Sequence, residues 1–135
     1  MPGRADGALD GGQLEWLAGA LADDPTTPTI VAMHHPPLRI GMPALDDIGL
    51  AGRDREALAS VLAAAPHVRR VVAGHVHMTA LGRIGDRDVA TSPSTWRVRA
   101  ALELGGSHFN LRDEPAGFAL HTLVDGSLVT HSQPL

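Results

Sequence analysis

Two short apolar runs, each cut off by histidines beside proline or glycine, limit the possible folds of this chain more than any other feature. Thr29–Met33 and Val68–Ala73 are rich in β-branched residues and have the length of buried strands. Between them, residues 53–65 show helical spacing of apolar side chains, and Pro66 ends that helix. This order of strand, helix and strand is typical of an α/β unit with parallel strands.

The segments around this unit complete the expected organisation. Residues 1–10 are rich in Gly and Asp and are expected to be a flexible lead-in. Asp10 can cap a helix over residues 11–22, because its side chain can accept a hydrogen bond from the first helical turn. Residues 38–52 contain several glycines and a proline and are expected to be a long loop.

The last part of the chain changes character. Residues 83–92 and 96–103 are each expected to form a short strand. Further on, residues 118–124 and 127–132 flank Asp125-Gly126, a strong signal for a two-residue hairpin. We therefore expect an antiparallel C-terminal hairpin.

Composition excludes several classes of function. The net charge of −4 provides no basic surface for a nucleic-acid partner. The chain has no cysteine, which excludes disulfides and thiolate zinc sites. No apolar stretch is long enough for a membrane span, and the first seven residues lack the apolar core of a signal peptide. We therefore expect a cytoplasmic protein without a membrane partner.

Histidines occupy equivalent positions after the two expected strands. His34-His35 follows the first strand, and His75-Val76-His77 follows the second after one glycine. Ligands of open α/β sheets gather at the carboxyl ends of the strands, and imidazole is the commonest transition-metal ligand. Taken singly, each motif could be only a polar loop or a chance pattern. Taken together, at matching strand ends, they favour a metal site.

Three motifs carry a resemblance to a known family. They are Gly12-Gln13-Leu14-Glu15-Trp16-Leu17, Met33-His34-His35-Pro36-Pro37 and Ala73-Gly74-His75-Val76-His77. In this order they resemble calcineurin-like metallophosphoesterases, and within that superfamily the class III cyclic-nucleotide phosphodiesterases and their glycerophosphodiesterase relatives. The resemblance extends from about residue 9 to residue 135. It implies that residues 11–135 are the C-terminal half of a four-layer α/β/β/α sandwich.

The resemblance also implies a two-metal site. Family members bind two divalent ions (Fe, Mn, Zn or Co) with five sequence blocks, of which this chain holds the last two. By this likeness His34 and His75 would be ligands of one metal, and His77 of the other. His35 would lie beside the site as a catalytic residue rather than a ligand. The implied reaction is hydrolysis of a small-molecule phosphodiester, a 3′,5′-cyclic nucleotide or a glycerophosphodiester, by a metal-bridged hydroxide.

The first three blocks of the family are absent. Neither D-x-H nor G-N-H occurs in the sequence. Gly85-Asp86-Arg87-Asp88 superficially resembles the G-D-x-x-[DE] block, but its second acid is one residue too early and it follows G-H-x-H. The bridging aspartate and the catalytic Asn-His pair are therefore missing. We expect that an N-terminal half, or another chain, must supply them.

Three hypotheses remain open at this point. The first is a phosphodiesterase whose N-terminal half lies elsewhere, with residues 38–52 and 91–96 as candidate walls of the substrate pocket. The second is a non-catalytic module for binding or for homo-oligomerisation, since the two strands alone would expose apolar edges. The third is a self-contained site in which His34, His75 and His77 hold one ion.

Overall fold

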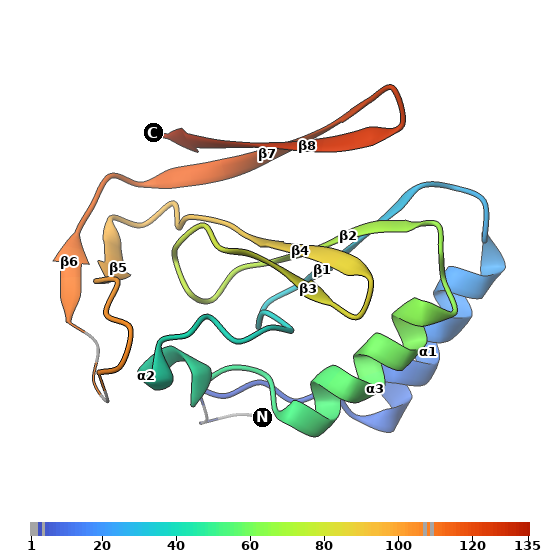
Figure 1. Ribbon diagram of the computed structural model, residues 1–135, viewed down its shortest axis with the longest axis horizontal. Helices are drawn as coiled ribbons and strands as arrows, with labels where there is room; N and C mark the ends of the chain where they lie inside the picture. The colour runs from blue at the N-terminus through green and yellow to red at the C-terminus, as the bar shows by residue number, and fades with distance from the viewer. Residues whose placement is uncertain (1–2, 4, 107, 109) are drawn as a thin grey trace.

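The computed structural model describes residues 3, 5–106, 108 and 110–135 of the 135-residue chain. In chain order the elements are α1 (Gly11–Asp23), β1 (Thr29–Met33), α2 (Pro43–Asp46), α3 (Gly52–Ala63), β2 (Val68–Ala73), β3 (Leu81–Ile84), β4 (Arg87–Thr91), β5 (Val98–Ala100), β6 (Leu111–Asp113), β7 (Gly117–Val124) and β8 (Ser127–Pro134). Figure 1 shows the helices α1 and α3 below a central sheet and the β7–β8 hairpin above it.

The central sheet has the strand order β1-β2-β4-β3. β1 pairs with β2 in parallel, with Val31 opposite Val71, and β2 pairs with β4 in parallel, with Val71 opposite Val89. β3 returns antiparallel to β4. The predicted parallel α/β unit is thus confirmed, and the bounds of β1 and β2 are those expected from the sequence.

One face of the sheet packs against the two long helices. Val31, Val71 and Val89 point into this layer, where they form a buried cluster with Leu58 and Leu62 of α3. α1 begins with a capping box, because Asp10 Oδ1 accepts a hydrogen bond from Gln13 N at 2.8 Å and Gln13 Oε1 accepts one from Asp10 N at 3.1 Å. The core therefore lies between the helices and the sheet.

The C-terminal hairpin is also confirmed. β7 and β8 pair in register from Gly117 opposite Pro134 to Val124 opposite Ser127. Asp125 and Gly126 have φ values of 49° and 78°, as a two-residue hairpin turn with two left-handed positions requires. The antiparallel hairpin is therefore observed, whereas the four-layer sandwich of a larger domain stays a prediction.

Three expectations about secondary structure are corrected by the structure. Residues 38–52 are not a continuous loop, because α2 forms inside them and buries Met42 and Leu45 against Val76 and Met78. Residues 83–92 are not one strand but the end of β3, a turn with Gly85 at φ 57° and all of β4. Within 96–103 only Val98–Ala100 is a strand. Its partner β6 had no clear sequence signal.

The expected lead-in contacts the body of the fold. Gly7 forms an isolated parallel bridge with Leu50, and its N–H donates to the carbonyl of Gly49 at 3.2 Å. Met1, Pro2 and Arg4 lie outside the described residues. Among the described helices, none combines the length and apolar character needed to cross a membrane.

Candidate metal centre

The parallel pairing of β1 and β2 brings the two histidine motifs to one edge of the sheet. Met33 and Ala73, the last residues of the two strands, are register partners. Directly beyond them, Gly74 N–H donates to the carbonyl of His34 at 3.0 Å. The chain then turns at Pro36 and Pro37, which are both fully buried. The edge is therefore fixed by backbone pairing on one side and by two packed prolines on the other.

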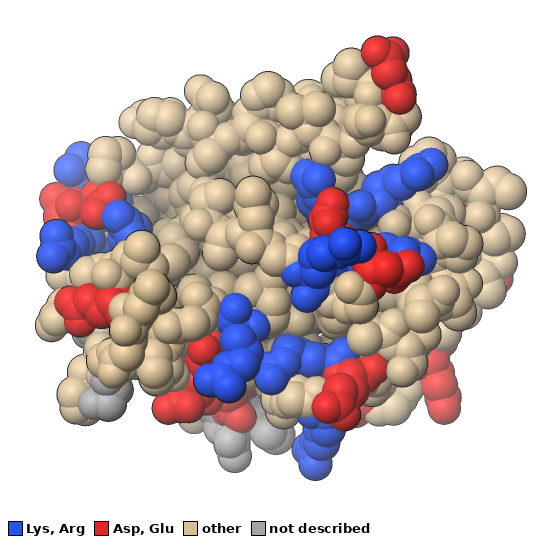
Figure 2. Space-filling model, viewed as in Figure 1, with Lys and Arg blue, Asp and Glu red and all other residues tan. Residues whose placement is uncertain are grey.

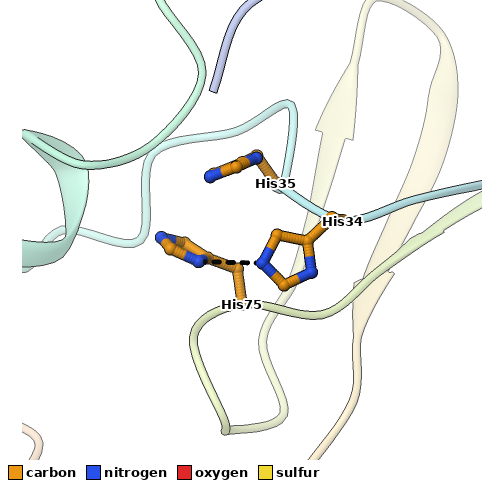
Figure 3. Close-up of side chains that lie close together, drawn as sticks. All are labelled: His34, His35 and His75. Atoms are coloured by element: carbon orange, nitrogen blue, oxygen red, sulfur yellow. Dashed lines mark hydrogen bonds between the residues drawn. The ribbon is translucent and has the colours of Figure 1, made fainter. Parts of the chain in front are cut away.

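Three imidazoles converge at this edge, as Figure 3 shows. Potential ligand nitrogens of His34, His35 and His75 all lie within 4.8 Å of one another. His34 Nε2 and His75 Nδ1 are 3.2 Å apart, and the ring centroids of His35 and His75 are 4.3 Å apart. His35 thus belongs to the cluster itself, although the sequence analysis placed it beside the site.

Backbone carbonyls orient two of these rings. His75 Nε2 lies 3.1 Å from the carbonyl oxygen of Ile48, and His35 Nε2 lies 2.9 Å from that of Ala5. Since a carbonyl oxygen can only accept, each Nε2 carries the proton and each Nδ1 carries the lone pair. Metal-binding histidines are commonly fixed in this way by a hydrogen bond from the nitrogen that faces away from the metal.

The electrostatics of the cluster favour neutral imidazoles. Burial, followed by the neighbouring charges of His35 and His34, lowers the pKa of His75 to about 4, although the hydrogen bond to the Ile48 carbonyl acts in the opposite direction. Burial, followed by the charges of His35 and His77, also lowers the pKa of His34. Metals bind neutral imidazole, so these two rings are in the binding form near neutral pH.

The donor set fits a transition-metal ion. Two nitrogens bound to one tetrahedral ion at about 2.0–2.1 Å lie about 3.3 Å apart, close to the 3.2 Å between His34 Nε2 and His75 Nδ1. Imidazole suits zinc, iron, manganese and cobalt. No Asp or Glu joins these three histidines in the described part of the chain. The cluster can therefore supply imidazole ligands, but not a bridging carboxylate.

His77 lies outside this cluster. Its Nδ1 is 2.9 Å from the carbonyl oxygen of Val98, which leaves Nε2 with the lone pair, and its ring centroid lies 6.2 Å from that of Trp96. His75 and His77 both have left-handed backbones, with φ values of 66° and 55°. Such values are uncommon for residues other than glycine and often occur at functional sites. The role of His77 as a ligand of the other ion stays a prediction.

The two acids of the 38–52 segment, Asp46 and Asp47, lie outside the histidine cluster. The carboxylate of Asp46 accepts hydrogen bonds from Ile40 N at 2.6 Å and Gly41 N at 3.2 Å, and it pairs with Arg39 at 3.3 Å. It therefore organises the segment before α2. Asp47 is exposed beside it.

Sequence reasoning missed the backbone groups that orient the rings. The carbonyls of Ala5, Ile48 and Val98 come from three separate segments. Every residue has a carbonyl, so the sequence carries no signal for these contacts. Only the fold determines which carbonyls face the histidines.

Comparison with known proteins agrees with the motifs. No protein-family model matches the chain. The chain is 36% identical over 117 residues to a probable cyclic nucleotide phosphodiesterase of Synechococcus sp. The matched region covers 87% of this chain and 45% of the relative. The chain is 39% identical over 125 residues to the 3′,5′-cyclic adenosine monophosphate phosphodiesterase CpdA of Escherichia coli K12, covering 92% of this chain and 44% of the relative.

A third relative extends the likeness to another substrate class. The chain is 33% identical over 95 residues to the glycerophosphodiester phosphodiesterase GpdQ of Enterobacter lignolyticus, covering 70% of this chain and 34% of the relative. The chain thus spans less than half the length of each of these three proteins. The resemblance inferred from the histidine motifs is confirmed: the chain belongs to the calcineurin-like metallophosphoesterases of the class III cyclic-nucleotide phosphodiesterase and glycerophosphodiesterase type, as a partial member.

Proposed function

We propose that this chain supplies the histidine side of the active site of a metal-dependent phosphodiesterase. The substrate class is a 3′,5′-cyclic nucleotide or a glycerophosphodiester, the two classes named by the relatives. The observation that carries the proposal is the convergence of His34, His35 and His75 at the carboxyl ends of two parallel strands. This is the crevice in which open α/β sheets bind their ligands.

The residues of this chain have distinct tasks in the proposed reaction. His34 and His75 present nitrogens at the spacing of ligands to a shared ion. His35 lies against His75 and its Nε2 is held by the Ala5 carbonyl, which leaves Nδ1 as a proton acceptor next to the ligands. When bound, divalent ions would neutralise phosphate charge and lower the pKa of a coordinated water.

The site needs carboxylates that this chain does not bring to the cluster. We expect them from the missing part of the protein or from another chain, because the relatives are more than twice as long as the matched region. Among the described residues, β1 has a partner strand on one side, β2, and its other edge is open. Beside β1, a hollow of about 640 Å³ extends from Trp16 to His34 and His35. An added strand at this edge would end next to the histidines.

Reconstitution tests the proposal. The chain would be co-expressed with a segment that carries D-x-H, G-D-x-x-[DE] and G-N-H-[DE], such as the corresponding part of the E. coli CpdA relative. With added manganese, we expect hydrolysis of bis(p-nitrophenyl) phosphate by the complex and very little by the chain alone. His75→Ala should abolish the activity, because a two-metal site fails when one ion is lost. His131→Ala, an exposed residue of β8, is the matched control.

Each outcome of this experiment has a consequence. Activity that depends on His75 but not on His131 supports the proposed function. A complex that holds two metals and cleaves no diester would replace it with the non-catalytic binding module. Turnover by the isolated chain, abolished by His75→Ala, would show that the missing blocks are not required.

A site for one ion is the second candidate. It is favoured because three imidazoles from this chain alone lie within reach of one another. Three-histidine sites with an open water position are known for catalytic zinc. Metal titration of the isolated chain separates the candidates: about one tightly bound ion per chain favours the self-contained site, and little or no binding favours the shared site.

A further inference from the structure

A second hollow, of about 400 Å³, lies on the His77 side of the candidate metal centre. Its walls come from residues 77–79, residues 93–99 and the adjoining ends of β7 and β8. The residues that matter for its chemistry are His77, Ser94, Trp96, Arg97, Arg99 and Gln133. The volume is within the range of small-molecule pockets. Part of its wall belongs to residues 91–96, one of the two segments expected from the sequence to line the substrate pocket.

Trp96 is a large aromatic residue that is exposed and yet held in position. Its side chain is 64% exposed. Its backbone N–H donates to Ser94 Oγ at 3.0 Å, and the Ser94 carbonyl accepts from Gly117 N at 2.8 Å. The indole meets the His77 ring at 83°, as an edge contact rather than a stack. The backbone that carries the indole is thus fixed, and the exposed indole is accessible to a planar ligand.

His77 joins the hollow to the metal edge. It lines the hollow, and it follows His75 of the metal cluster by two residues. Its Nδ1 is occupied by the Val98 carbonyl. A molecule bound at both places would therefore have its phosphate at the histidine cluster and its organic group against Trp96.

The charges of the hollow select against a second anion. Arg97 pairs with Asp113 at 3.0 and 3.3 Å, and Arg99 pairs with Glu114 at 2.6 Å. Figure 2 shows acidic and basic groups side by side at the end of the molecule where Figure 1 has β5 and β6. Since each arginine of the hollow already faces an acid, the hollow suits an uncharged group with hydrogen-bonding edges.

We infer that this hollow binds the planar base of a nucleotide, with the base stacked on Trp96 and its edge facing the Gln133 amide. The inference rests on the proposed function and deepens it, because it selects cyclic nucleotides over glycerophosphodiesters. A glycerol group has no π-face to stack, whereas stacking of a base on an aromatic side chain contributes about 1–3 kcal/mol.

The two tryptophans of the chain provide a matched test. Trp16 and Trp96 are 72% and 64% exposed, and they line different hollows. In the Trp16→Phe variant the fluorescence comes from Trp96, and in Trp96→Phe it comes from Trp16. Adenosine should quench the tryptophan fluorescence of Trp16→Phe and leave that of Trp96→Phe unchanged. Ribose, which lacks the base, should quench neither. Equal quenching of both variants, or of neither, would overturn the inference.

Affinity provides a second readout. Binding of adenosine, followed by NMR of the nucleoside, should weaken about fivefold or more in Trp96→Ala, which corresponds to a stacking loss of at least about 1 kcal/mol. Ser94→Ala should weaken it less, because the indole remains. Unchanged affinity in Trp96→Ala would refute the proposed base site. Adenosine has no phosphate, so its binding is independent of hydrolysis. If adenosine does not bind at Trp96, the phosphodiesterase proposal still stands, and if the reconstituted complex does not hydrolyse a diester, the adenosine result still stands.

Discussion

The central sheet and the β7–β8 hairpin are both built from apolar strands, yet they bury those strands to very different extents. In the sheet, Val71 is fully buried and Val89 is 1% exposed. In the hairpin, Leu120 and Leu123 are 49% and 54% exposed. The sheet has helices packed on one face, whereas the hairpin is a two-stranded sheet of its own. Two-stranded hairpins are marginal unless another element supports them.

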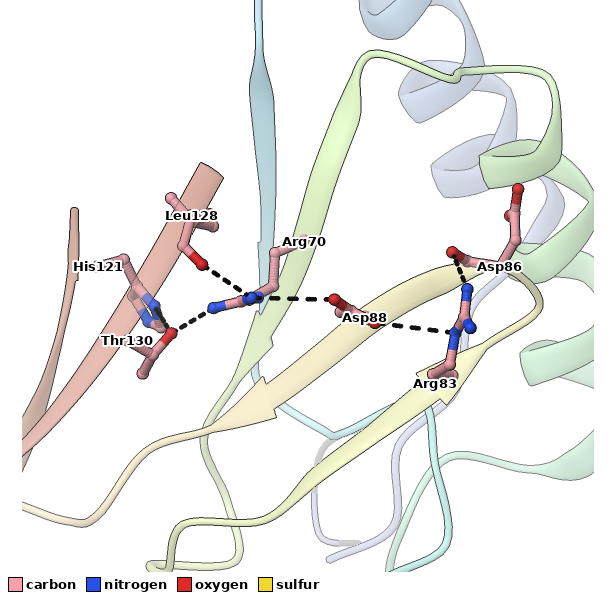
Figure 4. Close-up of polar contacts among 7 residues, drawn as sticks. All are labelled: Arg70, Arg83, Asp86, Asp88, His121, Leu128 and Thr130. Carbon is pink, nitrogen blue, oxygen red and sulfur yellow. Dashed lines mark hydrogen bonds and ion pairs between the residues drawn. The ribbon is translucent and has the colours of Figure 1, made fainter. Parts of the chain in front are cut away.

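Arg70 provides that support, as Figure 4 shows. It lies in β2 and crosses to the hairpin, where it donates to the Leu128 carbonyl at 3.1 Å and to Thr130 Oγ1. Thr130 also contacts His121 Nδ1 at 2.8 Å. The sheet thus holds the histidine cluster by apolar packing, whereas the hairpin is tied to the rest of the fold by polar contacts. Arg70 makes two of these contacts, and the others include Gly117 N to the Ser94 carbonyl at 2.8 Å and Thr79 Oγ1 to Ser132 Oγ at 3.3 Å.

The hairpin surface is almost free of charge. Asp125 is the only Asp, Glu, Lys or Arg in residues 117–134. In Figure 2 the upper part of this face is correspondingly uncharged except for one acidic group at the end. An uncharged surface with exposed leucines and Phe118 is typical of a contact for another protein segment.

The two regions should differ most in the stability lost when a leucine is replaced by alanine. Leu58→Ala should destabilise the protein by about 2–5 kcal/mol, because Leu58 is 1% exposed in the core cluster. Leu123→Ala should cost less than about 1 kcal/mol, since half of its side chain already faces solvent. Urea unfolding of both variants measures this. Equal losses would show that the hairpin is packed more tightly than the structure indicates.

Removing Arg70 should separate the regions. Arg70→Ala should destabilise the hairpin by about 1.5–3 kcal/mol, the usual contribution of hydrogen bonds from a charged group. Hydrogen exchange should accelerate in residues 117–134 and stay slow in β1 and β2. Arg69→Ala changes an exposed neighbour in the same strand and serves as the control. Faster exchange throughout the sheet would contradict the independence of the two regions.

The strands built from apolar residues could be predicted from the sequence better than the polar contacts between distant segments. β1 and β2 were predicted to the residue, because β-branched runs ended by proline or glycine are local signals. The Asp125-Gly126 turn is local as well. The β3–β4 hairpin was missed because residues 83–92 were assigned to one strand across the Gly85 turn. The place of His35 in the cluster depends on the Ala5 carbonyl, a contact between segments that no local pattern shows.

The stability of the hairpin should also depend on pH, through His121. Burial, and then the charge of Arg70, lowers the pKa of His121 below its usual 6.5. The unfolded chain therefore binds a proton at His121 more readily than the folded one. The stability that neutral His121 contributes is complete above about pH 6.5 and is lost as the pH falls through the pKa of the folded state. The hairpin should loosen on mild acidification, by less than Arg70→Ala causes.

His121→Gln isolates this contribution from the other histidines. The difference in unfolding free energy between wild type and variant should shrink as the pH falls below about 6.5, because only the wild type has the His121 proton to take up. The charged groups recorded near this ring are Arg70 and, beyond it, Asp88. A difference that is constant with pH would show that His121 does not titrate in the folded hairpin.

The smallest effect should come from the acid that completes the Arg70 network. Asp88 pairs with Arg70 at 3.9 Å and with Arg83 at 3.7 Å, but its side chain is 59% exposed. Solvent screens such pairs, which typically contribute between about 0 and 1 kcal/mol. Asp88→Asn should therefore shift the urea midpoint only slightly, and the shift should shrink further in high salt. It should leave hydrogen exchange in the hairpin unchanged, since the Leu128 and Thr130 contacts of Arg70 remain. A loss as large as that of Arg70→Ala would mean that Asp88 positions the arginine for its contacts with the hairpin.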